Sequence, residues 1–248
     1  MRICVGLVVL TFLAFLADAA TAAESAVTGN PSEPKYAVKE ERVKVPMRDG
    51  VHLAAEIYRP DAPGQFPVLM LLRYFGEGKR QADFFAPRGY AVALVSCRGR
   101  LGSEGTWVPY CNEPRDGFDA QQWLGQQPWS NGRIGTFGIS YNAFTQTMPA
   151  PLASPFLKCL FPVEGQQTNF GHLYNDGVMQ LNVVFEFGLH TKQGGQIQKI
   201  FRYDHPHYRR LPLLAAVDDF PNVQHVKDWF KHCRYDDYWK SYGIKEKY

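Results

Sequence analysis

The sequence predicts an α/β protein built on a doubly wound, mostly parallel sheet. Two apolar runs of strand length, residues 66–72 and 90–95, have no polar face, which is typical of strands buried on both sides of a parallel sheet. Stretches with helical spacing separate the strand-like runs, and this alternation predicts right-handed crossovers within one sheet. The 248 residues, 45% of them hydrophobic, are sufficient for one sizeable domain, with or without a smaller lobe.

The chain opens with a pattern typical of a secretory signal peptide. Arg2 precedes an apolar run at residues 3–16, and small residues follow in Ala-x-Ala frames that end at Ala19 and Ala22. A run of about fourteen apolar residues is shorter than the roughly 20 that a membrane-spanning helix needs. We therefore expect cleavage after Ala22, export to the periplasm or the extracellular space, and a polar linker over residues 23–40.

The folded part is expected to begin with an antiparallel hairpin. Apolar residues alternate on both sides of a turn at Arg48-Asp49-Gly50, as they do in two paired strands. The pattern then predicts strand, helix, strand, helix, strand and strand at residues 66–72, 81–86, 90–95, 114–124, 133–137 and 156–163.

We expect an α/β core over residues 41–165 and a helical cap over residues 166–248. Near-helical spacing of apolar residues predicts the cap helices; these residues are Tyr174, Met179, Leu181, Val184, Phe185 and Leu189.

Charge and motifs exclude several classes of function. The 27 Lys and Arg and 24 Asp and Glu give a net charge of +3 without a block of like charge, so neither nucleic acid nor a membrane surface is an expected partner. A loop with Gly99, Gly102 and Gly105 lacks both Gly-x-Gly-x-x-Gly and Gly-Lys-Ser/Thr. His205-Pro206-His207 beside Asp204 has no third ligand at a metal-site spacing. We therefore expect neither a metal nor an organic cofactor.

The cysteines leave two alternatives open. After export, Cys97, Cys111, Cys159 and Cys233 would enter an oxidising compartment. Cys97 and Cys159 lie in apolar segments, where a free thiol behaves as a small core residue. Buried thiols and a Cys97–Cys111 disulfide are both compatible with this pattern.

The junction after the strand at residues 133–137 is the strongest candidate for chemistry. In doubly wound sheets, functional residues lie at the carboxyl ends of the strands. Here Gly138-Ile139-Ser140-Tyr141-Asn142 joins a strand to a helix, a context in which a serine can be held on a sharp turn with its hydroxyl exposed. The alternative is a serine that caps the helix beginning near Asn142. A generic nucleophile turn has glycine two positions after the serine, where this chain has Asn142.

The chain resembles a family of serine hydrolases with the α/β-hydrolase fold, which includes X-Pro dipeptidyl-peptidases, cocaine esterase and α-amino-acid ester hydrolases. The matching segments are residues 45–53, 57–60, 66–69, 89–92 and 98–105, Glu113, residues 116–119, 123–124 and 127–135, Gly138-Ile139-Ser140-Tyr141 and Thr145-Gln146. Each segment alone is a weak signal, but their order and spacing together make the resemblance specific.

The resemblance implies roles for three residues. Ser140 would be the nucleophile, and the backbone N–H of Tyr141 would donate to the oxyanion. Tyr74, which follows the strand at residues 66–72, is the candidate for a second, hydroxyl donor; the alternative is an aromatic residue at the rim with no role. The family's glycine in Ser-Tyr-x-Gly is replaced by Ala143.

The rest of the catalytic triad has no clear candidate. Family members carry the catalytic Asp and His on strands after the cap, and a jelly-roll β domain follows; neither pattern is visible here. Asp176, Asp204, Asp218 or Asp219 could pair with His225 or His232, but none of them follows an apolar strand. The remaining cap histidines, His172, His190, His205 and His207, are expected to be surface or packing residues.

We therefore expect the N-terminal half of an exported serine hydrolase, truncated before the last strands. It would cleave ester or amide bonds of small molecules or short peptides, including X-Pro-type dipeptidyl bonds, through an acyl-enzyme on Ser140, with His and Asp supplied from beyond Tyr248. The alternative is a non-catalytic fragment or binding module without the Asp and His.

Overall fold

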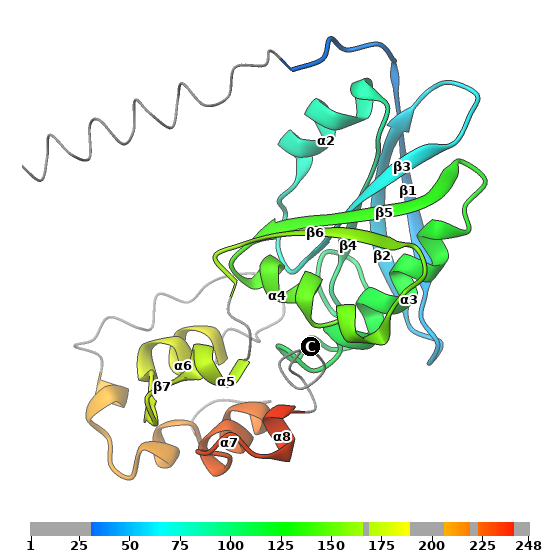
Figure 1. Ribbon diagram of the computed structural model, residues 1–248. Helices are drawn as coiled ribbons and strands as arrows, with labels where there is room; N and C mark the ends of the chain where they lie inside the picture. The colour runs from blue at the N-terminus through cyan, green and yellow to red at the C-terminus, as the bar shows by residue number, and fades with distance from the viewer. Residues whose placement is uncertain (1–30, 166–168, 189–205, 219–222, 241–248) are drawn as a thin grey trace, which may run out of the picture. The chain divides into compact units, whose positions relative to one another are not determined.

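The structure is a computed structural model that describes residues 31–165, 169–188, 206–218 and 223–240 (Figure 1). The described residues from Lys35 onward belong to one compact unit. The expected signal peptide and residues 23–30 of the expected linker lie outside the described residues, as do Asp204 and His205 of the possible metal site. Within the described ranges, no helix is both long and apolar enough to cross a membrane.

The core is a six-stranded sheet in the order β1-β2-β4-β3-β5-β6. Its strands are β1 (Val38–Pro46), β2 (His52–Pro60), β3 (Phe66–Arg73), β4 (Ala91–Ser96), β5 (Ser130–Ile139) and β6 (Leu157–Val163). The β1–β2 and β2–β4 pairs are antiparallel, whereas β4, β3, β5 and β6 run parallel. Every residue of β4 is buried, because helices cover both faces of the sheet at its centre. The predicted mostly parallel α/β sheet is confirmed.

Strand β1 begins at Val38, inside the stretch expected to be linker. Its first residues are exposed and charged, so no apolar alternation marks them. They pair with β2 nevertheless: Val38 is opposite Pro60, and Arg59 Nε donates to the Glu41 carboxylate over 3.0 Å. Cross-strand charge pairs of this kind stabilise an edge strand whose residues are too exposed to be stabilised by burial.

Helices lie on both faces of the sheet (Figure 1). On one face, α2 (Lys79–Phe85) and the 3-10 turn η1 (Ala86–Arg88) pack with Leu71, Val92 and Leu94. On the other face, α3 (Glu113–Gly125) and α4 (Tyr141–Thr147) pack with alternate residues such as Leu72 and Val95. This alternation follows from the period of two along a strand. Another 3-10 turn, η2 (Ala150–Leu152), leads into β6.

The region expected to be a cap is mainly helical, with one exception. Its elements are α5 (Asn169–Leu173), β7 (Tyr174–Asn175), β8 (Val178–Met179), α6 (Leu181–Gly188), η3 (Pro206–Arg209), η4 (Leu213–Ala216), α7 (Gln224–Lys231) and α8 (Asp237–Lys240). Tyr174 and Met179, expected in a helix, face each other across a two-residue hairpin. Asp176 and Gly177 have positive φ values of 48° and 83°, which end the helical path.

The cysteines favour the thiol interpretation. Cys97 is a free, buried thiol, so the alternative of a Cys97–Cys111 disulfide is contradicted. Cys159 is also a free thiol but is exposed, contrary to the expectation of a core position. It lies on β6, where every residue is exposed or half-buried.

Candidate active site

Ser140 lies on a strained turn between β5 and α4. Its φ of 58° and ψ of −121° are unusual for a residue with a side chain. Two backbone bonds hold this conformation: the Ser140 N–H donates to the Val163 carbonyl, and the Ser140 carbonyl accepts from the Ala143 N–H, each over 2.9 Å. Ser140 is exposed at the carboxyl end of the parallel strands.

The helix-capping alternative for Ser140 is wrong. The residue occupies the position before α4, but its side chain makes no capping hydrogen bond. A cap serine has an extended backbone that aims its oxygen at the helix amides. The positive φ of Ser140 instead leaves the hydroxyl available above the sheet.

Glycines make room for the turn. A Cβ on Gly138, whose φ is +150°, would lie 2.6 Å from Asn142 Cβ, so only glycine fits there. The fully buried Ala143, at the position where the resemblance led us to expect glycine, is accommodated in the same way. A Cβ on Gly165 would lie 2.6 Å from Ala143 Cβ, so the missing side chain at residue 165 gives the extra methyl group its space.

A buried hydrogen-bond network lies beneath the turn. The Tyr141 hydroxyl donates to Glu113 Oε1, and Trp107 Nε1 donates to the same oxygen over 3.1 Å. The Tyr110 N–H donates to the Tyr141 hydroxyl over 3.1 Å. Glu113 is 2% exposed, and desolvation raises the pKa of its carboxyl to about 7. This network fixes the Tyr141 side chain and thereby the first turn of α4.

Tyr74 is brought against Tyr141. Its ring stacks on Trp107, with centroids 5.3 Å apart, and meets the Tyr141 ring edge-on at 4.9 Å. The Tyr74 carbonyl accepts from Arg100 Nε over 2.8 Å. Burial raises the pKa of the Tyr74 phenol, which keeps the hydroxyl protonated and able to donate. The structure therefore unites the three residues chosen from the sequence and adds Trp107, which no sequence pattern indicated.

The cap histidines have other contacts. The buried His225 contacts the Gly188 carbonyl through Nε2 at 2.8 Å, and desolvation lowers the pKa of its imidazole. His172 packs against Phe144 at 5.3 Å between ring centroids. Among the described residues, no hydrogen bond joins a histidine to Ser140.

One histidine has a carboxylate partner that the sequence did not indicate. His232 Nδ1 lies 2.7 Å from Asp236 Oδ2, and its ring stacks on Tyr238. Asp218, a candidate partner for His225 or His232, instead pairs with Lys227 at 2.6 Å. Asp219 lies outside the described residues. Within the described ranges no group of three or more His, Cys, Asp and Glu is placed to hold a metal ion.

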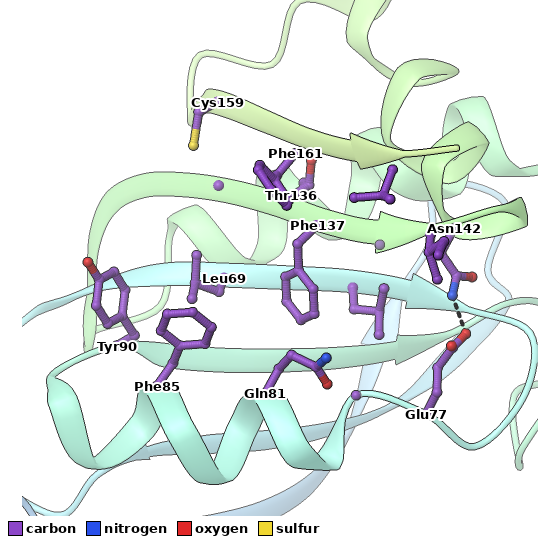
Figure 2. Close-up of a pocket in the computed structure, with 16 residues that line it drawn as sticks. Leu69, Glu77, Gln81, Phe85, Tyr90, Thr136, Phe137, Asn142, Cys159 and Phe161 are labelled. Carbon is purple, nitrogen blue, oxygen red and sulfur yellow. Dashed lines mark hydrogen bonds between the residues drawn. The ribbon is translucent and has the colours of Figure 1, made fainter. Parts of the chain in front are cut away.

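A pocket of about 650 Å³ opens on the α2 face of the sheet (Figure 2). Its walls are largely apolar, with Leu69, Phe85 and Phe137 among them. At one end Asn142 Nδ2 donates to Glu77 Oε1, as the dashed line in Figure 2 shows. The pocket therefore extends from the sheet face to the first turn of α4.

The fold and the turn at Ser140 together define the class of protein to which the chain belongs. A serine on a strained strand-to-helix turn, at the carboxyl ends of parallel strands with helices on both faces, is the arrangement of an α/β-hydrolase. The family model described as X-Pro dipeptidyl-peptidase (S15 family) matches residues 49–248. The chain belongs to this family.

Comparison with known proteins agrees with this assignment. The chain is 38% identical to cocaine esterase from Rhodococcus sp. (strain MB1 Bresler) over 128 residues, which cover 48% of the chain and 22% of that protein. It is 29% identical to the putative serine esterase Mb1866c from Mycobacterium bovis over 147 residues. The chain spans about a fifth of the length of these relatives.

Solved structures show the same fold. An α-amino acid ester hydrolase matches with a TM-score of 0.64 and 24% identity, over 89% of this chain and 42% of that one. A CocE/NonD family hydrolase from Staphylococcus aureus matches with a TM-score of 0.59 and 25% identity, over 87% of this chain and 44% of that one.

Proposed function

We propose that the protein is a serine hydrolase that cleaves ester or amide bonds through an acyl-enzyme on Ser140. The observation that carries this proposal is the strained, exposed turn at Ser140, held by Val163 and relieved of crowding by Gly138. Strain of this kind persists only where surrounding structure enforces it, and it concentrates at functional sites.

The proposed reaction is acyl transfer to water. Ser140 Oγ attacks the carbonyl carbon while its proton passes to a histidine base, and the alcohol or amine leaves with that proton. Water then attacks the acyl-enzyme and releases the carboxylic acid. We propose that the histidine and its orienting carboxylate lie outside the described residues, because no described histidine is hydrogen-bonded to Ser140.

Two donors would stabilise the oxyanion. We assign them to the Tyr141 backbone N–H, at the positive end of α4, and to the Tyr74 hydroxyl. The contact between the two rings and the raised pKa of the Tyr74 phenol support this assignment. The proposed substrates are small esters, amides or short peptides, in keeping with the relative named cocaine esterase and with the family described as X-Pro dipeptidyl-peptidase.

A fluorophosphonate probe tests the proposal. We expect covalent labelling of the purified protein and of the Ser32→Ala variant, which changes an exposed serine outside the sheet, but not of Ser140→Ala. Turnover of p-nitrophenyl acetate and of Gly-Pro-p-nitroanilide would then distinguish esterase from dipeptidyl-peptidase activity. A folded protein that shows no Ser140-dependent labelling and no turnover would instead be an inert binding module.

We also propose that the protein is exported. The apolar run at residues 3–16 and the Ala-x-Ala frame ending at Ala22 support this proposal. The intact mass and N-terminal sequence of the protein from its native host test it, with a mature start at Ala23 as the expected result and a retained Met1 as the opposing one.

A further inference from the structure

Two arginines, the buried Arg73 and the half-buried Arg100, hold the loop that carries Tyr74. Residues 74–78 connect β3 to α2, and Arg100 Nε holds the Tyr74 carbonyl over 2.8 Å. Arg73, only 5% exposed, donates to the Glu77 carbonyl and pairs with Glu56 over 2.8 Å. Short surface loops are ordinarily among the more mobile segments of a protein. These contacts restrain the backbone of this loop from the β3 side.

A further contact reaches the loop from the nucleophile side. Asn142, two residues after Ser140, is 1% exposed, and its Nδ2 donates to the Glu77 carboxylate (Figure 2). The same Asn142 packs so closely on Gly138 that a Cβ there would lie 2.6 Å from its own. The side chain of Asn142 therefore contacts both the turn at Ser140 and the loop of Tyr74.

We propose that Asn142 and Glu77 form a clamp that fixes the spacing of the two oxyanion donors. The two are positioning residues, and the proposal rests on the proposed function of Ser140. One donor, the Tyr141 N–H, belongs to the start of α4, and the other, the Tyr74 hydroxyl, belongs to the loop at residues 74–78. Donors must lie about 2.7–3.1 Å from the oxyanion, and a misplacement of about 1 Å can lower the rate by roughly 10²-fold.

The clamp is an arrangement that destabilises the fold locally. Among the described residues, the buried Asn142 Oδ1 has no hydrogen-bond partner, and burial of Glu77 raises the pKa of its carboxyl. An apolar pair would pack the same space without these penalties. Departures of this kind are expected at functional sites, where geometry matters more than stability.

The clamp also explains a departure in the sequence. The generic nucleophile turn has glycine two positions after the serine, and glycine has no side chain that could reach the loop. With asparagine at residue 142, the first turn of α4 gains an amide donor directed at Glu77. The short loop at residues 74–78 thus has a partner in the element that carries the nucleophile.

Steady-state kinetics of substituted proteins test the positioning role. For Asn142→Ala and Glu77→Ala we expect kcat to fall about tenfold to a hundredfold, with KM changed less than about twofold. The double variant should be no slower than the slower single variant, because both changes remove the same link. Glu77→Gln should retain most of the rate, because its amide oxygen accepts the same hydrogen bond. Arg80→Ala, which changes an exposed side chain of α2 that does not line the pocket, is the matched control with an unchanged rate.

Hydrogen exchange provides a readout that does not depend on hydrolysis. We expect amides of residues 74–78 to exchange faster in Asn142→Ala than in the wild type or in Arg80→Ala. Unchanged exchange in this loop would overturn the clamp, and faster exchange with an unchanged kcat would overturn the positioning role. If Ser140→Ala hydrolysed substrate at the wild-type rate, the proposed function would fail, while loop exchange would still decide whether the clamp exists.

Discussion

Replacing Glu113 with glutamine is expected to remove a loss of stability that the wild type undergoes between about pH 4.5 and pH 7. The usual pKa of a glutamate is 4.5, and desolvation raises that of Glu113 to about 7. Each unit of difference corresponds to about 1.4 kcal/mol, so the shift corresponds to about 3 kcal/mol. The folded protein holds this proton more tightly than the unfolded chain does. The free energy of unfolding therefore falls as the pH rises through this window.

The Glu113→Gln variant keeps the acceptor for Tyr141 and Trp107 but has no charge to desolvate. Urea unfolding followed by tryptophan fluorescence, at intervals from pH 4 to pH 8.5, would give the free energy of unfolding of both proteins. The variant should gain about 3 kcal/mol relative to the wild type between the two ends of this range, whatever the constant offset between them. A Glu33→Gln control, at an exposed site, should show no such gain. A difference that does not change with pH would refute the reasoning.

Three further predictions concern Tyr74, Gly138 and the ion pair between Arg98 and Asp116. Tyr74→Phe should lower kcat about 10²-fold without changing the urea midpoint, because it removes one oxyanion donor and keeps the stacked ring. An unchanged kcat would mean that Tyr74 is an aromatic residue at the rim with no role in the reaction. Gly138→Ala should destabilise the fold by about 1–3 kcal/mol in urea unfolding and abolish probe labelling, since the new Cβ would lie 2.6 Å from Asn142 Cβ. Arg98→Ala should destabilise by about 3–5 kcal/mol, because it leaves the buried Asp116 without its two 2.7 Å hydrogen bonds; a loss below about 1 kcal/mol would contradict this.

The sheet was largely predictable because its central strands leave a strong local signal. A strand buried on both faces, such as β4, is apolar at nearly every position, and such a run is visible without any knowledge of its partners. The sequence did not predict the start of strand β1, because its pairing depends on charged residues such as Glu41 and Arg59 that lie on different strands. The hairpin at Tyr174 was predicted as a helix, because the spacing of its apolar residues fits a helix as well as a tight turn.

The sequence indicated the nucleophile turn of the candidate site, and the family resemblance added Tyr74, but the network around them could not be predicted. Gly138 and Ser140 follow an apolar strand directly, so their spacing carries the signal. The contacts of Glu113 and Trp107 with Tyr141 join residues far apart in the chain, and no periodicity records them. In the cap region, the His232–Asp236 pair is four residues apart and joined at 2.7 Å, and this spacing could have indicated the contact.

The bond between the Ser140 N–H and the Val163 carbonyl has a consequence for the order of folding. Val163 is the last residue of β6, so this bond forms only after β6 has paired with β5. Until then only the bond from the Ala143 N–H to the Ser140 carbonyl opposes relaxation of Ser140 to a negative φ, which its side chain favours. During synthesis the hairpin and central strands can assemble as soon as they leave the ribosome, whereas the nucleophile acquires its reactive geometry only once β6 has followed.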